Sequence, residues 1–194
     1  MGSYYYLVAQ LPCLVYEQSP PMSSENFLSL AQSYLKKNDM KLFDCLLLKD
    51  CASSDAGDKY SDCDFINNYR DWEYSLRQSL AIQRAIKLNK PAPQQTNFRL
   101  DTASVASKAM DESSPLEAEL VLDKARWYAI DSFAGNDIFN RKYLYSYYLK
   151  LLLIERREAF NVEKGFSEYK SLYASILDLH NKSKGVEESQ GEHT

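Results

Sequence analysis

The sequence has little glycine and little histidine. Its six glycines are isolated from one another along 194 residues, so no stretch resembles the glycine-rich loop that binds phosphate in nucleotide-hydrolysing enzymes. Its two histidines, His180 and His193, lie at the end of the last predicted helix and in a polar segment that we expect to be disordered. The sequence therefore favours neither a phosphate-binding loop nor a histidine-centred catalytic triad.

The four cysteines lack the spacing of a metal site. Cys13, Cys45, Cys51 and Cys63 contain no Cys-x-x-Cys pair. Zinc and iron–sulfur sites use such short paired spacings to direct their ligands. We therefore expect free thiols, no metal and no bound cofactor.

The sequence also lacks an excess of basic charge and a long apolar run. Its 23 Lys and Arg residues are outnumbered by 27 Asp and Glu, giving a formal net charge of −4, which disfavours a nucleic-acid partner. The longest apolar run, around residues 151–154, is much shorter than the ~20 residues that span a bilayer. Without a signal-like N-terminal stretch, we expect a soluble, cytoplasmic protein with no direct membrane span.

Apolar residues at helical spacing are the main structural signal. They predict an all-α protein, a helical bundle of about six to seven helices with a short extended N-terminal segment. This segment is the tyrosine-rich stretch 4–12, for which a single short helix is the alternative. The helices are expected at about 24–37, 39–48, 64–89, 102–111 and 115–133, from a cap at Asn136 or Asp137 to 160, and from a cap at Asn161 to 177.

Composition divides the chain near its middle. The stretch NKPAPQQTN, at residues 89–97, contains two prolines and no apolar periodicity, which is typical of a linker. We therefore predict an N-terminal helical subdomain at 1–89, a linker at 90–100 and a C-terminal helical subdomain at 101–180. The polar residues 181–194 are predicted to be a disordered tail.

Aromatic residues crowd the region 125–160. They lie in two helical runs that are separated by Ala134, Gly135 and Asn136, which predicts a helical hairpin. The apolar stripe on its second helix is expected to be mainly core, with tyrosine hydroxyls reaching the surface.

Three arginines recur every seven residues on the predicted helix 64–89. Arg70, Arg77 and Arg84 should form one stripe, and Glu73 is spaced for ion pairs with the first two. The simpler interpretation is a solvated face with weak local pairs. The alternative is a surface for an acidic partner helix, which makes the three arginines our candidate partner-binding residues.

Several charges interrupt apolar helical runs. Glu119 and Arg126 lie seven residues apart on one helix face, and Glu155 lies within the apolar run of the next helix. Buried pairing between neighbouring helices would explain these charges, so Glu73, Glu119, Arg126 and Glu155 are candidate structural ion pairs. An acid–base pair of Glu119 and Glu155 in a small helical enzyme is the alternative. Since no nucleophile or ligand set accompanies them, we assign no catalytic residue.

Four stretches covering most of residues 4–170 carry a resemblance as a set. They are YYYLVAQLP followed by PPMS, then WEYSLRQSLAIQRAIKL, SPLEAELVLDKARWYAID, and LYSYYLKLLLIERREAFNVEKG. Together they resemble an uncharacterised bacterial family encoded in operons for V-type (archaeal-type) ATPases. The resemblance implies a shortened relative of the V-type ATPase socket subunit, an all-helical funnel that sits on the membrane rotor ring and receives the central shaft.

This resemblance sets the functional expectation. It implies a noncatalytic accessory or central-stalk component, similar to the socket subunit, that couples or assembles rotor parts of a V-type rotary ATPase. Its partners would be other subunits of that ATPase, in the rotor ring or the central shaft, at the inner face of the plasma membrane. The alternative is a free-standing helical adaptor or assembly factor that binds its partners transiently.

Overall fold

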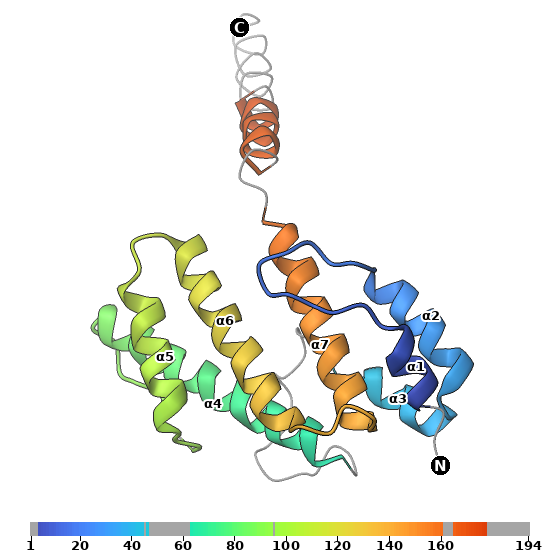
Figure 1. Ribbon diagram of the computed structural model, residues 1–194. Coiled ribbons are helices and arrows are strands. Elements are labelled where there is room, and N and C mark those ends of the chain that lie inside the picture. Colours follow the sequence, from blue (N-terminus) through green and yellow to red (C-terminus); the bar gives the residue numbers. More distant parts are fainter. Residues whose placement is uncertain (1–3, 45, 47–62, 95, 161–164, 178–194) are drawn as a thin grey trace, which may run out of the picture. The chain divides into compact units, whose positions relative to one another are not determined.

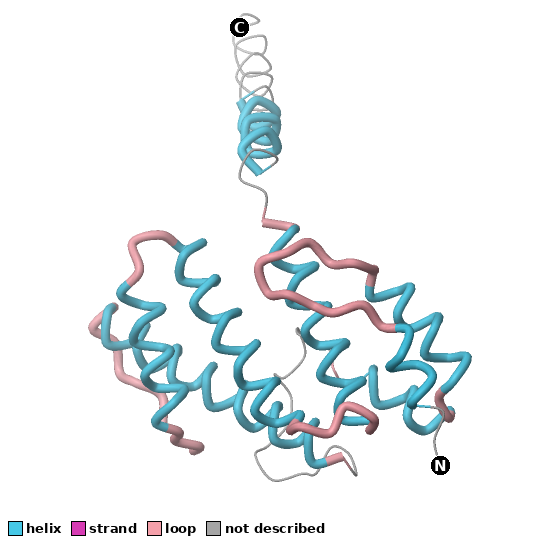
Figure 2. Tube along the Cα trace, in the orientation of Figure 1, coloured by secondary structure: helices cyan, strands magenta, loops and turns pink. Residues whose placement is uncertain are grey.

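The chain is helical throughout the part that the computed structural model describes, which is residues 4–44, 46, 63–94, 96–160 and 165–177. These residues form eight helices and no strand, which confirms the predicted all-α class (Figure 1, Figure 2). Seven helices are labelled: α1 (Tyr4–Gln10), α2 (Ser24–Tyr34), α3 (Lys37–Asp44), α4 (Asp64–Lys87), α5 (Leu100–Asp111), α6 (Pro115–Ala134) and α7 (Arg141–Glu158). The eighth covers residues 165–177.

The described chain falls into two compact units, Met1–Arg157 and Glu158–Thr194. The first contains α1–α6 and nearly all of α7, and the second contains the helix at 165–177. Within the described ranges, no helix combines the length and the apolar character needed to cross a membrane. The predicted disordered tail at 181–194 lies outside the described residues.

The N-terminal segment is a helix, so the expected extended conformation is wrong and the alternative holds. Tyr4, Leu7, Val8 and Leu11 recur at helical spacing and all pack against the main apolar core, with Leu7 fully buried. An extended chain would send neighbouring side chains to opposite faces and could not bury this set together. The helix ends before Pro12, which disfavours a helical conformation at the residue preceding it.

Two predicted helix ends shift because side chains and local backbone decide them. The second predicted helix ends at Tyr34 rather than at residue 37, since Leu35 is extended, with φ −98° and ψ 153°. The next helix then starts at Lys37, and the last residues of its predicted range, 47 and 48, lie outside the described residues. At its start, α2 has the predicted serine cap, because the Ser23 hydroxyl accepts a hydrogen bond from the amide of Asn26.

The connection between α4 and α5 lies where the sequence predicts a linker. Residues 88–94 and 96–99 join the two helices, and α5 starts at Leu100, two residues before its predicted start. The helices on either side of this connection pack against each other, and α5 in turn packs on α6. The division into subdomains at 90–100 stays a prediction.

The α6–α7 connection forms the predicted helical hairpin with a later second cap. Ser114 caps α6 by accepting the amide of Leu116, with Pro115 in the first turn as expected. The predicted cap of α7 at Asn136 or Asp137 is wrong, since α7 begins at Arg141. The Asn140 side chain accepts the amide of Tyr143 at 2.9 Å and so provides the acceptor that a helix start requires.

The second helix of this hairpin, α7, is buried over much of its surface. Half of its 18 residues are buried, which fits the prediction that its apolar stripe is core. The tyrosine hydroxyls do not all reach the surface as expected, because Tyr145 is fully buried and its hydroxyl donates to the carbonyl of Asp39 at 3.1 Å. Tyr147 donates to the carbonyl of Pro12 at 2.9 Å, and burial raises its pKa to about 12. These hydrogen bonds let aromatic residues with polar ends fill the core.

The loop between α1 and α2 is fixed to α6 and α7. Arg157 donates to the carbonyls of Tyr16 and Gln18, and its guanidinium lies 5.1 Å from the centre of the Tyr16 ring. The Tyr16 hydroxyl donates to the carbonyl of Leu120, and its ring lies edge-on to Trp127 at 5.4 Å. The N-terminal part of the chain is therefore held on the later helices over more than 100 residues of sequence.

Two apolar cores lie inside the first unit. The larger core combines α1–α3 with one end of α4, Ile130 of α6 and most of α7. The smaller one lies between α4, α5 and α6, and its buried members are Trp72, Leu76, Leu80, Ala106, Ala109, Leu122 and Ala129. Because α4 and α6 contribute to both cores, these two helices connect them.

Candidate functional site

The most buried charges in the described chain meet where α4 and α6 face each other. The Arg126 guanidinium donates from Nε to Glu73 Oε2 at 3.0 Å and from Nη2 to Glu73 Oε1 at 3.1 Å. Only 8% of the Arg126 side chain and 4% of the Glu73 side chain are exposed. This two-point geometry is the strong form of an Arg–carboxylate pair, and it joins residues 53 positions apart in the sequence.

Two further residues extend this pair towards α7. Arg126 Nη1 lies 2.8 Å from Asp123 Oδ1, and Arg156 of α7 lies 3.5 Å from the same oxygen. Arg156 also donates to Glu119 Oε2 at 2.5 Å, while Arg126 lies 4.0 Å from that atom. We call Glu73, Arg77, Glu119, Asp123, Arg126 and Arg156 the charge cluster.

The electrostatics of the charge cluster depend on burial and on mutual neutralisation. Burial alone would lower the pKa of Arg126, but the Glu73 carboxylate beside it outweighs burial and raises that pKa. At Asp123 burial dominates and raises the pKa, although Arg126 and Arg156 act in the opposite direction. Asp123 Oδ2 is buried and has no hydrogen-bond partner within the described residues, which agrees with a carboxyl group that ionises less readily.

The predicted ion pairs are thus partly brought together. Glu73, Glu119 and Arg126 belong to one cluster, as their spacing indicates. Glu155 lies elsewhere, where its Oε1 accepts the amide of Ser24 at 2.6 Å at the start of α2. A carboxylate is favoured at this position by the positive end of the helix dipole.

Sequence reasoning missed Asp123 and Arg156. Arg156 is the immediate neighbour of the predicted Glu155, and successive residues on a helix point about 100° apart, so an uncertainty of one residue in helix phase exchanges their roles. Asp123 lies three residues before Arg126, a spacing that places both on one helix face and would have indicated it.

The arginine stripe lies along α4 with its members in different surroundings. Arg77 is partly exposed and donates from Nε to Glu73 Oε1 at 3.1 Å, so it belongs to the charge cluster. Arg70 is half-buried and Arg84 is exposed. Binding of an acidic partner by this stripe stays a prediction.

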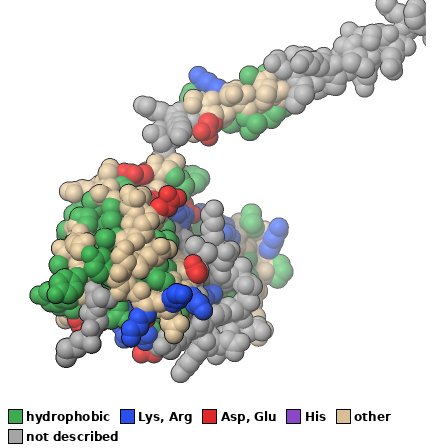
Figure 3. Space-filling view, turned by 90° about the vertical axis from the view of Figure 1, so that its right-hand side faces the viewer, with side chains coloured by type: hydrophobic (Ala, Val, Ile, Leu, Met, Phe, Trp, Pro, Cys, Tyr) green, Lys and Arg blue, Asp and Glu red, His purple; other side chains and the backbone are tan. Residues whose placement is uncertain are grey.

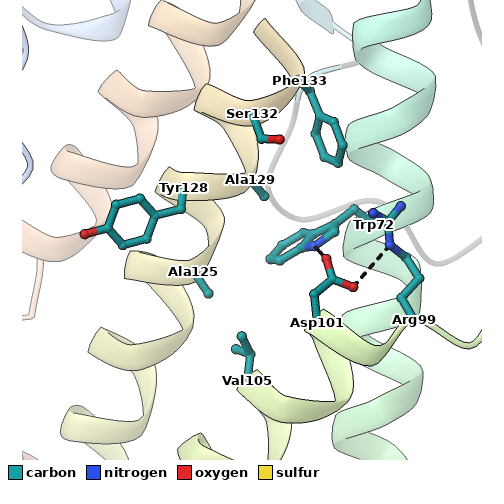
Figure 4. A pocket seen from close by; sticks show the side chains of 9 residues that line it. All are labelled: Trp72, Arg99, Asp101, Val105, Ala125, Tyr128, Ala129, Ser132 and Phe133. Carbon is teal, nitrogen blue, oxygen red and sulfur yellow. Dashed lines mark hydrogen bonds and ion pairs between the residues drawn. The ribbon is translucent and has the colours of Figure 1, made fainter. Parts of the chain in front are cut away.

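A pocket of about 330 Å³ opens between α4, α5 and α6 (Figure 4). The Trp72 indole donates to Asp101 Oδ2 at 2.9 Å, and Arg99 Nε lies 3.4 Å from Asp101 Oδ1. Partial burial raises the pKa of Asp101, but the Trp72 hydrogen bond and Arg99 outweigh it, so the pKa is lowered. The small residues Ala125 and Ala129 of α6 line the opposite side.

The two carboxylates of the enzyme alternative serve different contacts. Glu119 contacts Arg156, and Glu155 contacts the backbone of α2. Neither lines the pocket at Trp72 or the pocket beside Tyr16 and Arg157. The arrangement of these two groups is therefore suited to neutralising and capping helices rather than to an acid–base pair across a cleft.

No group of three or more His, Cys, Asp and Glu side chains that could hold a metal ion gathers within the described residues. Of the cysteines, Cys13 is exposed and Cys63 is buried, and both are free thiols. Cys45 and Cys51 lie outside the described residues, as do His180 and His193.

Comparison with known proteins gives no assignment. No family model matches the sequence, no curated protein matches it, and no solved structure matches the fold.

Proposed function

We propose that the protein is a noncatalytic helical binding protein that acts as an accessory or central-stalk component of a V-type rotary ATPase, similar to its socket subunit. It would couple or assemble rotor parts at the cytoplasmic face of the membrane. The V-type assignment rests on the resemblance of the four sequence stretches in residues 4–170. The structural support is the charge cluster.

The charge cluster supports a mechanical role. It joins α4, α6 and α7 through charges that are mutually neutralised, and Glu73 and Arg126 are nearly inaccessible to solvent. Removing one member of such a cluster leaves a buried charge, so the relative positions of the helices are strongly specified. A part that transmits force between subunits needs this resistance to deformation.

Exposed aromatic side chains support a binding role. Tyr5 and Tyr6 of α1 are 59% and 70% exposed, and Ile138 and Phe139 of the α6–α7 connection are 46% and 43% exposed. The Tyr5 and Phe139 rings stack at 4.4 Å, so the two segments form one patch. Figure 3 views the side of the first unit that carries α1–α3, where apolar side chains gather at the surface. Exposed aromatic groups of this kind are typical of protein interfaces.

Copurification tests the proposal. A tagged full-length chain expressed in its own host should bring down the rotary ATPase subunits from native membranes at a constant ratio. Deleting its gene should release or destabilise the complex. Failure of the tagged chain to recover these subunits, together with an intact complex in the deletion strain, would exclude the proposal.

A free-standing adaptor or assembly factor is the second candidate. The two filled apolar cores of the first unit favour it over a funnel around a shaft, because they describe a packed bundle. An adaptor would be present during assembly and absent from the purified active complex. Stoichiometric presence in that complex excludes it.

A further inference from the structure

The helix at residues 165–177 exposes an unusual amount of apolar surface. All 13 of its residues are exposed. Its six large apolar side chains are between 43% and 62% exposed: Phe166, Tyr169, Leu172, Tyr173, Ile176 and Leu177. An isolated helix of this length is marginally stable in water, so burial of this face is what would stabilise it.

The apolar residues share one face. At 100° per residue they cover an arc of about 140°, with Leu172 at one edge and Leu177 at the other. Two contacts order the side chains within this face. The Tyr169 and Tyr173 rings stack at 6.1 Å, and the Lys170 ammonium lies 4.5 Å from the centre of the Phe166 ring. We call this surface the docking face.

The charge of the helix argues against a membrane surface as its occupant. Its charged side chains are Glu168 and Lys170, which cancel. Amphipathic helices that bind anionic membranes carry several Lys or Arg residues on the polar face, and each contributes about 1 kcal/mol. The polar face here consists mainly of serine and alanine.

The length and width of the docking face argue against a second copy of the chain. A coiled-coil seam through Phe166, Tyr169, Tyr173 and Ile176 would continue through His180 and Ser183, which are polar. The apolar seam is therefore shorter than the three to four heptads that are typical of a coiled coil. Its arc is also wider than a two-stranded seam, which uses only two positions in seven.

We propose that the docking face binds in an apolar groove between two helices of a partner subunit. This inference rests on the proposed function, because the partner is taken to be a subunit of the rotary ATPase. A groove contacts a helix on both flanks and so can cover a wide face. The six side chains offer roughly 600 Å², approaching the ~800 Å² per partner of a typical specific interface.

The test places two charges on opposite faces of this helix. In the tagged full-length chain, Leu172→Asp with Ile176→Asp alters the docking face. Ser171→Asp with Ala174→Asp adds the same charge to the polar face as the matched control. We expect the first variant to recover at least about tenfold less ATPase from native membranes, and the control to stay within about twofold of wild type.

The outcomes separate this inference from the proposed function. If the wild-type chain recovers no ATPase subunits, both are wrong. If the wild-type chain and the Leu172→Asp, Ile176→Asp variant recover them equally, the docking face is wrong and the proposed function stands. A loss that is equal in the polar-face control also overturns the docking face.

Hydrogen exchange on the full chain tests the remaining occupants. We expect fast exchange of the amides at 169–177 in the isolated monomer and at least about tenfold slower exchange in the complex. Protection in the isolated monomer would show packing within the chain itself and would overturn the proposal. So would a dimer that the docking-face variant abolishes, or binding to vesicles of phosphatidylcholine and phosphatidylglycerol.

Discussion

Arg126 carries a positive charge at a position where 7% of the residue is exposed. Glu73 is its two-point partner, so Glu73→Gln should leave this charge incompletely compensated. We expect a loss of about 3–5 kcal/mol in the free energy of unfolding, measured by urea denaturation. Arg77→Gln is the matched control, because it removes the other partner of Glu73 from a side chain that is 37% exposed, and it should cost less than about 1 kcal/mol. Equal losses in both variants would contradict the assignment.

Asp123 gives the charge cluster a pH dependence of known sign. Burial raises its pKa in the folded state above the ordinary value of 3.8, against the effect of Arg126 and Arg156. The folded state therefore holds the proton more tightly than the unfolded state. Its contribution to stability is complete below pH 3.8 and is lost as the pH rises through the raised folded-state pKa.

Asp123→Asn removes this titration. The free energy of unfolding of the wild type minus that of the variant should decrease as the pH is raised from about 4 to about 7. Urea denaturation of both proteins at several pH values measures the difference. A difference that stays constant or increases over this range would contradict the raised pKa.

The residues of the charge cluster could be named from the sequence only in part. Spacing on one helix places Glu119 and Arg126 on a shared face, and charge within an apolar run indicates pairing. The pairing of Glu73 with Arg126 spans 53 residues and depends on how α4 meets α6, which no local pattern specifies. The choice between Glu155 and Arg156 depends on helix phase, which periodicity gives only approximately.

Helices were predictable as elements because apolar periodicity repeats over many residues, whereas their ends depend on single side chains. The start of α7 shows this difference. Asn136, Asp137 and Asn140 can all act as caps by residue type, and the structure uses Asn140. At Asp137 the side chain instead accepts the amide of Phe139 and stabilises a turn.

Gly135 is the element-scale feature that the sequence identified correctly as a break. It follows α6 with φ +72° and ψ −169°, a conformation that is essentially restricted to glycine. An added Cβ meets nothing within 4 Å, so the cost of Gly135→Ala is backbone strain alone. We expect a loss of about 1–3 kcal/mol in the free energy of unfolding, measured by urea denaturation.

Gly165→Ala is the control for that strain. An added Cβ at Gly165 also meets nothing within 4 Å, and the residue lies in a helix without a positive φ. Alanine there should leave stability unchanged or raise it by up to about 1 kcal/mol. A similar loss at both glycines would show that strain at Gly135 is not the cause.

For the whole molecule, composition predicted a division at residues 90–100, while packing is a property of side chains from distant segments. The smaller core combines Trp72 and Leu80 of α4 with residues of α5 and α6, from both sides of that stretch. Proline and the absence of apolar periodicity correctly indicate a loop. They carry no information on whether the helices that the loop joins pack against each other.

The shared helices α4 and α6 predict that the two cores of the first unit unfold together. Trp72 lies in the smaller core and Trp127 packs on the larger, so the Trp127→Phe background reports on Trp72 alone. In that background, Leu144→Ala in the larger core should lower the urea midpoint of Trp72 fluorescence by an amount corresponding to about 2–5 kcal/mol. Leu80→Ala, in the same core as Trp72, is the positive control. If Leu80→Ala shifts the Trp72 transition and Leu144→Ala does not, the chain consists of independently unfolding subdomains separated at 90–100, as its composition predicts.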